Sequence, residues 1–120
     1  MGSLIFRFED FGPNSVDIVA LDGDLDAYSS PRLGQLLNEL IERGSKHIVI
    51  DCTALKYVDS SGLGALVAAF KRISAESGVL DLAQINGDVR RVLQITGLDV
   101  LFRLYNSVDE ARDAAVLQSA

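Results

Sequence analysis

The sequence predicts a single α/β domain over residues 1–120, with a mixed, mostly parallel five-stranded sheet flanked by about four helices. Three observations lead to this prediction. A length of 120 residues suits one domain, and 48% apolar residues are enough to build its core. Apolar side chains alternate in some segments and recur every three or four residues in others. After two initial strands these patterns alternate along the chain, which is typical of parallel strands joined through helices.

The first two segments predict an antiparallel hairpin. Apolar and charged side chains alternate over residues 4–10, as in a strand with one buried face. Residues 11–15, FGPNS, have the composition of a turn, and residues 16–23, VDIVALDG, predict a second and more deeply buried strand.

Residues 29–44 predict a helix with clear end signals. Ser30 is a suitable N-cap, Pro31 falls at the first helical position, and Gly44 follows the last turn. The apolar residues of this segment form one stripe at i, i+3, i+4, i+7 and i+8, made of Leu33, Leu36, Leu37, Leu40 and Ile41.

The rest of the chain alternates between strands and helices. Residues 47–51, HIVID, are short and rich in β-branched residues, as expected for a strand covered on both faces. The helix that follows begins at the DSSGLG motif of residues 59–64 and is ended by Gly78. The last four elements are a strand over 79–85, a helix over 87–97, a strand over 100–105 and a helix over 107–117. The predicted order is therefore β-β-α-β-α-β-α-β-α.

Charge and composition exclude several classes of function. Acidic residues outnumber basic ones, 17 to 11, and the basic residues are scattered, which argues against binding to a nucleic-acid backbone. No run approaches the roughly 18 apolar residues of a membrane span, and the N-terminus lacks the layout of a signal peptide, so we expect a cytoplasmic protein. The single cysteine, Cys52, can form no internal disulfide and is predicted to be a small buried side chain.

Two polar loops lie where α/β proteins gather function. Residues 22–30 and residues 57–62 each follow a strand and precede a helix, at the carboxyl edge of the predicted sheet. The first loop has aspartates spaced D-x-D-x-D from Asp22, as in a calcium loop. An EF-hand would also need glycine and glutamate where this chain has Ala27 and Leu33, so we expect no metal site.

Catalytic interpretations of the second loop lack the necessary partners. A nucleophilic Ser60 or Ser61 needs a base, and the only histidine, His47, begins a strand whose other end leads to the loop. A phosphoaspartate receiver domain would use Asp51, but it needs a lysine after its last strand, and no lysine follows Lys71. Neither of these two catalytic interpretations fits the residues, and we expect no cofactor.

Two interpretations of the serine pair remain open from the residues alone. Asp59 and Ser60 could simply cap the helix. Alternatively, Ser60 could accept a phosphate, because a helix start offers unpaired N–H groups and a partial positive charge. Gly62 and Gly64 would keep the backbone approachable. A phosphate there would strengthen a negative face to which the aspartates of residues 22–30 also contribute, and it would expel a partner docked on that face.

Four stretches together resemble the STAS-domain family, and most of all its stand-alone bacterial anti-sigma-factor antagonists. They are LDGDLDAYSSPRL, HIVID, VDSSGLGALV and VRRVLQITGLDVLFRLY. The resemblance implies a small mixed sheet flanked by helices and a role without catalysis. It implies that an anti-sigma factor, itself a serine kinase, binds the unmodified protein and thereby frees a sigma factor. Phosphorylation then ends the binding, and a PP2C-type phosphatase resets the protein.

The resemblance also assigns roles to single residues. Ser60 matches the phosphorylated serine, with Ser61 as the second choice, and Asp59 either orients the loop or contacts the kinase. The residues implied to face the partner are Asp24, Asp26, Ala27, Ser29, Asp59, Ser61, Gly62 and Leu63. The family suggests a monomer or weak dimer.

Two other functions stay open for a chain of this family. One is a scaffold or transporter-complex subunit that binds its partner constitutively. The other is a module that senses a small ligand or nucleotide. Retention of the whole DSSG sequence favours the phosphorylation switch over both.

Overall fold

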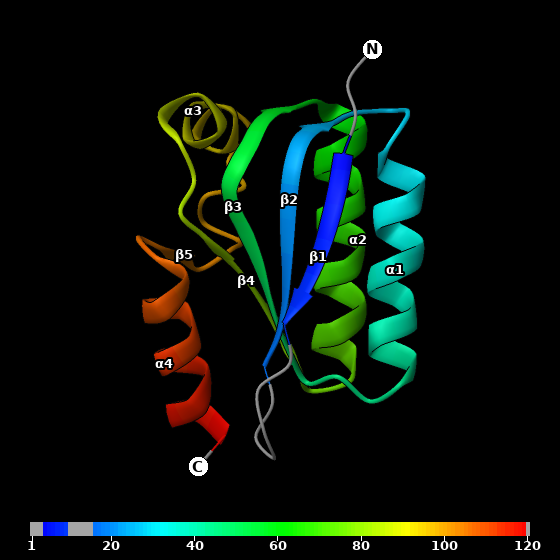
Figure 1. Ribbon diagram of the computed structural model, residues 1–120, viewed down its shortest axis with the longest axis vertical. Helices are drawn as coiled ribbons and strands as arrows, with labels where there is room; N and C mark the ends of the chain where they lie inside the picture. The colour runs from blue at the N-terminus through cyan, green and yellow to red at the C-terminus, as the bar shows by residue number, and fades with distance from the viewer. Residues whose placement is uncertain (1–3, 10–15, 120) are drawn as a thin grey trace.

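In the computed structural model, which describes residues 4–9 and 16–119, five strands and four helices follow the predicted order (Figure 1). The strands are β1 (Leu4–Glu9), β2 (Asp17–Leu25), β3 (His47–Val58), β4 (Val79–Ala83) and β5 (Leu104–Tyr105). The helices are α1 (Ser30–Glu42), α2 (Ser60–Ala75), α3 (Gly87–Thr96) and α4 (Val108–Ser119). The predicted turn over residues 11–15 lies outside the described residues. None of the helices in the described part of the chain is long and apolar enough to cross a membrane.

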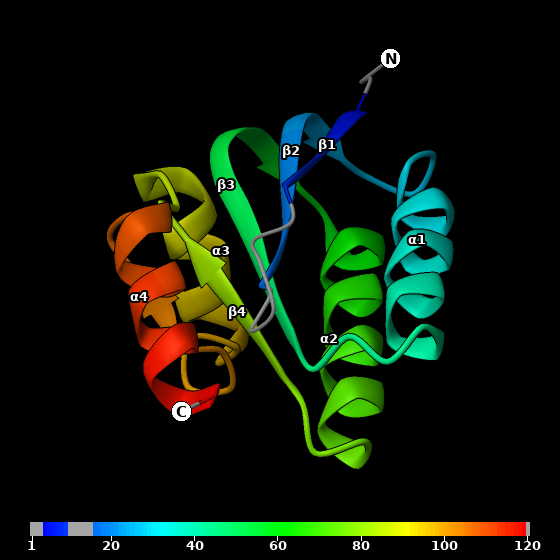
Figure 2. The ribbon, with the colours of Figure 1, turned by 60° about the horizontal axis from the view of Figure 1, so that its bottom comes forward.

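The strands form one sheet in the order β1-β2-β3-β4-β5, which confirms the predicted mixed, mostly parallel sheet. β1 runs antiparallel to β2, and the other three neighbouring pairs are parallel. Helices α1 and α2 lie side by side on one side of the sheet, and α3 and α4 lie on the other (Figures 1 and 2). The carboxyl ends of β2 and β3 consequently lead into the first turns of α1 and α2.

The apolar residues form two core clusters. The larger one joins the inward residues of the sheet to the apolar faces of α1 and α2 and extends to Val89 and Leu93 of α3. The smaller one lies beneath α4, where Val49 packs with Ala111 and Ala115. Cys52 is 1% exposed in the larger cluster, as predicted, and burial raises the pKa of its thiol to about 12.

The start of α1 differs from the prediction by one residue. Ser29 is the N-cap and Ser30 is the first helical residue, so the assignment of Ser30 as N-cap is wrong. The Ser29 side chain makes no capping bond, because its hydroxyl is hydrogen bonded within the preceding turn. The end of the helix is as predicted, with Gly44 at φ +95° directly after the C-cap Arg43.

The last strand is much shorter than the predicted span of 100–105. Only Leu104–Tyr105 pairs with β4. The preceding segment forms a helical turn instead, in which Phe102 donates its N–H to the carbonyl of Leu98 at 3.2 Å. Phe102 is 3% exposed and packs edge-on against Phe70 with a ring-centroid distance of 5.3 Å. Burial of this ring from a turn overrides the strand propensity of the sequence.

Strand β3 is longer than predicted and therefore delivers the DSSGLG motif directly. The prediction ended this strand at Asp51, but β3 continues to Val58. Asp51 lies in mid-strand, where its carboxylate accepts the N–H of Thr53 at 3.0 Å. The next residue after the strand is Asp59, the N-cap of α2. The site thus begins where a buried strand ends.

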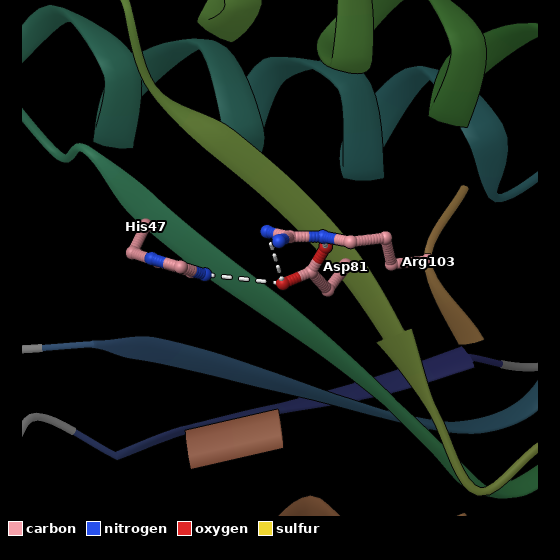
Figure 3. A network of polar contacts seen from close by, with 3 residues as sticks. All are labelled: His47, Asp81 and Arg103. Carbon is pink, nitrogen blue, oxygen red and sulfur yellow. Dashed lines mark hydrogen bonds and ion pairs between the residues drawn. The ribbon is translucent and has the colours of Figure 1, made fainter. Parts of the chain in front are cut away.

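A network of polar contacts around the buried Asp81 links β3, β4 and the approach to β5. Asp81 of β4 is 1% exposed and accepts two hydrogen bonds from Arg103, at 2.9 Å from Nε and 3.1 Å from Nη2 (Figure 3). His47 Nε2 lies 3.1 Å from the same carboxylate, so this histidine has a structural position at the far end of β3. Because Leu82 also donates its N–H to the Arg103 carbonyl at 3.0 Å, the short edge strand is held firmly.

Candidate functional site

The two polar loops meet at one edge of the sheet, as the sequence predicted. β2 and β3 are parallel neighbours, and Leu25 at the end of β2 is paired with Val58 at the end of β3. Each strand leads directly into a helix, so the first turns of α1 and α2 lie close together (Figure 1). The site therefore consists of residues 24–29, called the acidic turn below, and the start of α2.

The acidic turn is organised by Asp26 and Ser29. The Asp26 carboxylate accepts the N–H groups of Tyr28 and Ser29, both at 3.0 Å. The Ser29 hydroxyl accepts the Asp26 N–H at 3.0 Å and lies 2.9 Å from the carbonyl of Asp24, to which it donates. The hydrogen bond from the Ser29 N–H is the main cause that lowers the pKa of Asp26 from its usual value of 3.8. The turn thus holds its own shape and carries a fixed negative charge.

Asp59 caps α2 and also reaches the acidic turn. One carboxylate oxygen, Oδ1, accepts the Gly62 N–H at 3.0 Å, which is the usual N-cap bond. The other, Oδ2, accepts the Ala27 N–H at 3.2 Å across the site. The Asp59 N–H in turn donates to the carbonyl of Leu25 at 3.1 Å. The last two of these bonds join the two loops at one residue.

Ser60 and Ser61 are the first two helical residues, and both are exposed. Asp59 caps the helix, which confirms that part of the capping interpretation, whereas Ser60 is the first helical residue and takes no part in the cap. Among the described residues, the hydroxyls and N–H groups of these two serines have no hydrogen-bond partner. Helix geometry leaves the first N–H groups unpaired, and they favour an anion at this position. An exposed hydroxyl and unpaired donors therefore occur together at Ser60.

Gly62 has a different role from the predicted one, whereas nothing contradicts the prediction that Gly64 keeps the backbone approachable. A Cβ on Gly62 would lie 2.6 Å from both the Leu25 carbonyl oxygen and the Leu25 Cγ, so this glycine permits close packing of α2 on the end of β2. Gly64 has open space around its Cα and is exposed. Leu63 is buried, at 6% exposure. Of the predicted partner-facing residues, Ser29, Gly62 and Leu63 lie inside, and a contact with a partner would use the others.

Two exposed aromatic residues at this edge were missed in the sequence analysis. Tyr28, in the acidic turn, is 76% exposed, and Tyr57, next to the end of β3, is 52% exposed. Tyr57 is paired with Asp24 in the sheet and lines a shallow, mostly apolar groove together with Val89 and Val92 of α3. The signal that could have identified them is a large aromatic residue inside each polar loop.

No metal site is formed by the described residues. They contain no group of three or more histidine, cysteine, aspartate or glutamate side chains arranged around a common point. The carboxylates of Asp26 and Asp59 are instead used to accept backbone N–H groups.

Comparison with known proteins agrees with this geometry. The family model described as STAS domain matches residues 12–111. The anti-sigma F factor antagonist of Paenibacillus polymyxa is 33% identical over 91 residues, which are 75% of this chain and 78% of that protein. The anti-sigma-B factor antagonist of Staphylococcus aureus (strain NCTC 8325 / PS 47) is 29% identical over 72% of this chain and 80% of its own length. The crystal structure of an anti-sigma factor antagonist from Mycobacterium paratuberculosis superposes with a TM-score of 0.84 at 28% identity and covers 94% of each chain.

Proposed function

Because the chain belongs to the STAS-domain family, we propose that it is an anti-sigma-factor antagonist whose binding is switched off by phosphorylation of Ser60. The single observation that carries this proposal is the position of Ser60. Its side chain is exposed at the first turn of α2, beside donors without a partner in the described chain and beside the acidic turn. A kinase can reach such a hydroxyl without unfolding the domain.

The proposed modification is a phosphoryl transfer from ATP bound to the partner kinase. The Ser60 Oγ attacks the terminal phosphorus, the new O–P bond forms as the bond to the ADP leaving group breaks, and the hydroxyl proton passes to a base of the kinase. This chain contributes only the acceptor and its position. A PP2C-type phosphatase would return the hydroxyl by hydrolysis with water.

The charge at this edge explains why the modification should end binding. The acidic turn and Asp59 already place several carboxylates beside Ser60. A phosphate adds about −1.5 to −2 charges at neutral pH. A partner with a basic patch would fit the unmodified edge, and its anchoring would use the exposed rings of Tyr28 and Tyr57. The added dianion occupies the space that the partner fills in the unmodified complex, so we expect steric exclusion, together with repulsion of partner carboxylates that face Ser60, to outweigh its attraction to the basic patch.

The cellular setting follows from this proposal. The partner is an anti-sigma factor that is also a serine kinase, and the unmodified protein frees the sigma factor by occupying that partner. The residues proposed to meet it are Asp24, Asp26, Ala27, Asp59 and Ser61, whereas the buried Ser29, Gly62 and Leu63 would shape this edge from inside. We place the protein in the cytoplasm, as a monomer or weak dimer that acts without catalysis of its own.

The test is a pull-down from a lysate of the source bacterium, with and without ATP, followed by mass spectrometry of the bait and the captured proteins. We expect a captured serine kinase without ATP, and one phosphate on Ser60 and loss of the kinase with ATP. The variant Ser60→Ala should keep the kinase bound and take up no phosphate. The neighbouring Ser61→Ala is the matched control for the acceptor and should still take up one phosphate on Ser60 and then release the kinase.

Three results would contradict the proposal. Full labelling of Ser60→Ala would move the site to Ser61 or remove it from this motif. A partner that stays bound after stoichiometric phosphorylation would favour a constitutive scaffold. Absence of any captured kinase and of any phosphate would also contradict it.

A further inference from the structure

The Asp59 carboxylate is bonded to two different segments of the chain. Its Oδ1 accepts the Gly62 N–H of its own helix at 3.0 Å, and its Oδ2 accepts the Ala27 N–H of the acidic turn at 3.2 Å. We call this pair of hydrogen bonds the Asp59 bridge. A helix cap needs only the first bond, so the second has a separate role.

The outer part of the acidic turn, residues 26–28, depends on this bridge for its position beside Ser60. Within the turn, Asp26 and Ser29 satisfy one another and the neighbouring N–H groups, so its shape is set locally. Between the turn and the start of α2, the Asp59 side chain is the only one among the described residues that makes a hydrogen bond across the gap. Asp24 and Leu25 are held by their pairing with β3 and by the Asp59 N–H, which donates to the Leu25 carbonyl at 3.1 Å. Loss of the bridge would therefore leave the strand end in place and allow residues 26–28 to move away from Ser60.

We propose that Asp59 is a positioning residue, whose carboxylate holds the acidic turn beside Ser60 so that a partner meets both as one preassembled face. This inference rests on the proposed function, because it concerns binding at the same edge. Its physical basis is preorganisation: a partner that finds the turn already in place does not spend binding free energy on ordering it.

An aspartate is required for this role, and asparagine cannot replace it. A carboxylate has two oxygens, and each can accept an N–H group. An asparagine amide has one oxygen and one NH₂ group, so it can accept from Gly62 or from Ala27, and its NH₂ would face the other N–H as a second donor. Since asparagine is as good an N-cap as aspartate, Asp59→Asn should keep the helix cap and lose the link to the turn.

The experiment compares Asp59→Asn with Asn86→Ala, a variant that removes the N-cap bond of α3 away from the bridge. The first measurement is amide hydrogen exchange by NMR. We expect the Ala27 N–H to exchange about tenfold faster in Asp59→Asn, as for loss of one hydrogen bond, and Gly62 to stay as in the wild type. In Asn86→Ala both amides should exchange as in the wild type.

The second measurement is phosphorylation of Ser60 by the kinase that the wild-type protein captures. We expect KM for Asp59→Asn to rise about three- to tenfold with kcat unchanged, since positioning affects binding and leaves the transfer step alone. Asn86→Ala should leave both constants unchanged, even if its melting temperature falls further than that of Asp59→Asn.

The inference is overturned if Ala27 exchanges at the wild-type rate in Asp59→Asn, or if KM is unchanged while Ala27 is deprotected. An effect on kcat alone would also overturn it. If the wild-type protein captures no kinase, the proposed function fails, and the exchange of Ala27 still decides whether the bridge positions the turn.

Discussion

The helices α2 and α3 begin in similar ways but present different surfaces. Each starts with an extended N-cap residue whose Oδ1 accepts the N–H three residues later, at 3.0 Å for Asp59 and 2.9 Å for Asn86. Each cap side chain then reaches a neighbouring segment. Asp59 accepts an N–H from Ala27, whereas Asn86 donates to the Leu55 carbonyl at 2.8 Å. The second partner of each cap thus determines whether the residue must be an acid or an amide.

This difference shows how one local device can serve structure at one helix and binding at another. At α3 the cap is neutral, its second bond is donated to the carbonyl of the buried Leu55 in β3, and the first helical residue is a glycine. At α2 the cap is charged, its second bond fixes an exposed acidic turn, and the first helical residue is the exposed Ser60. Only the second arrangement offers a surface whose charge a phosphate could change.

The largest difference in stability is expected between two glycine-to-alanine variants, one at the start of α2 and one at the start of α3. In Gly62→Ala the new Cβ would meet the Leu25 carbonyl oxygen at 2.6 Å, and a backbone atom cannot move aside cheaply. We expect a loss of about 1–3 kcal/mol in the free energy of unfolding, as for other overpacked positions. In Gly87→Ala nothing lies within 4 Å of the new Cβ, so we expect no loss and a gain of up to about 1 kcal/mol.

Urea denaturation of the two variants beside the wild type gives both values. Equal stability of Gly62→Ala and Gly87→Ala would contradict the close approach of α2 to β2.

A smaller effect is expected from exchanging the two cap residues. Asn86→Asp keeps the cap but places a carboxylate against the Leu55 carbonyl, and two acceptors facing each other should cost about 1–2 kcal/mol. Asp59→Asn keeps the cap and loses one hydrogen bond at an exposed site, which should cost at most about 1 kcal/mol. Thermal unfolding of the two variants measures the difference. A greater loss in Asp59→Asn than in Asn86→Asp would reverse the comparison.

The acidic turn should also respond to pH in a predictable direction. The folded-state pKa of Asp26 lies below 3.8, so its hydrogen bonds stabilise the turn above that pH and are lost as the pH falls through the lower folded value. An NMR titration of the Ser29 N–H should therefore show a midpoint below 3.8, which Asp26→Asn should abolish. A midpoint at or above 3.8 would mean that the carboxylate is not bonded in this way. The Asn86 cap does not titrate.

The smallest effect is expected on the reactivity of Cys52, which lies in β3 and is buried in the larger core cluster. Its thiol is buried, and its pKa is raised to about 12, so the reactive thiolate is scarce at neutral pH. Iodoacetamide should label it only on unfolding. We expect the labelling rate under native conditions to be the same in Asp59→Asn, Asn86→Ala and the wild type. Faster labelling in either variant would show that the substitution opens the core as well as the helix start.

The sequence predicted the order of elements and the meeting of the two loops because both depend on local patterns. Periodicity identified the helices, and the rule that function gathers at the carboxyl edge of parallel strands brought residues 22–30 and 57–62 together. The length of β3 was underestimated, since it continues past the charged Asp51 and is held there by its neighbours in the sheet. The length of the last strand was overestimated, because Phe102 lies in a helical turn before the strand and its ring is buried against Phe70.

Individual hydrogen bonds and packing contacts between residues far apart in the sequence could not be predicted from the chain alone. The Asp59 bridge joins residues 32 positions apart, and Asp81 is bonded to Arg103 across 22 positions. Asp59 was singled out as a residue that orients the loop or contacts the kinase, but the acceptor geometry that distinguishes it from asparagine depends on where Ala27 lies. Gly62 shows the same limit: its packing against Leu25 is a property of the folded chain.

The most direct test of the central claim is the affinity of the captured kinase for the protein before and after phosphorylation of Ser60. The protein is titrated into the kinase in the presence of a non-hydrolysable ATP analogue. We expect the phosphorylated form to bind at least about a hundredfold more weakly, because the phosphate occupies space that the partner fills and faces partner carboxylates beside Ser60. Equal affinity of the two forms would contradict the account, whatever the stoichiometry of the modification.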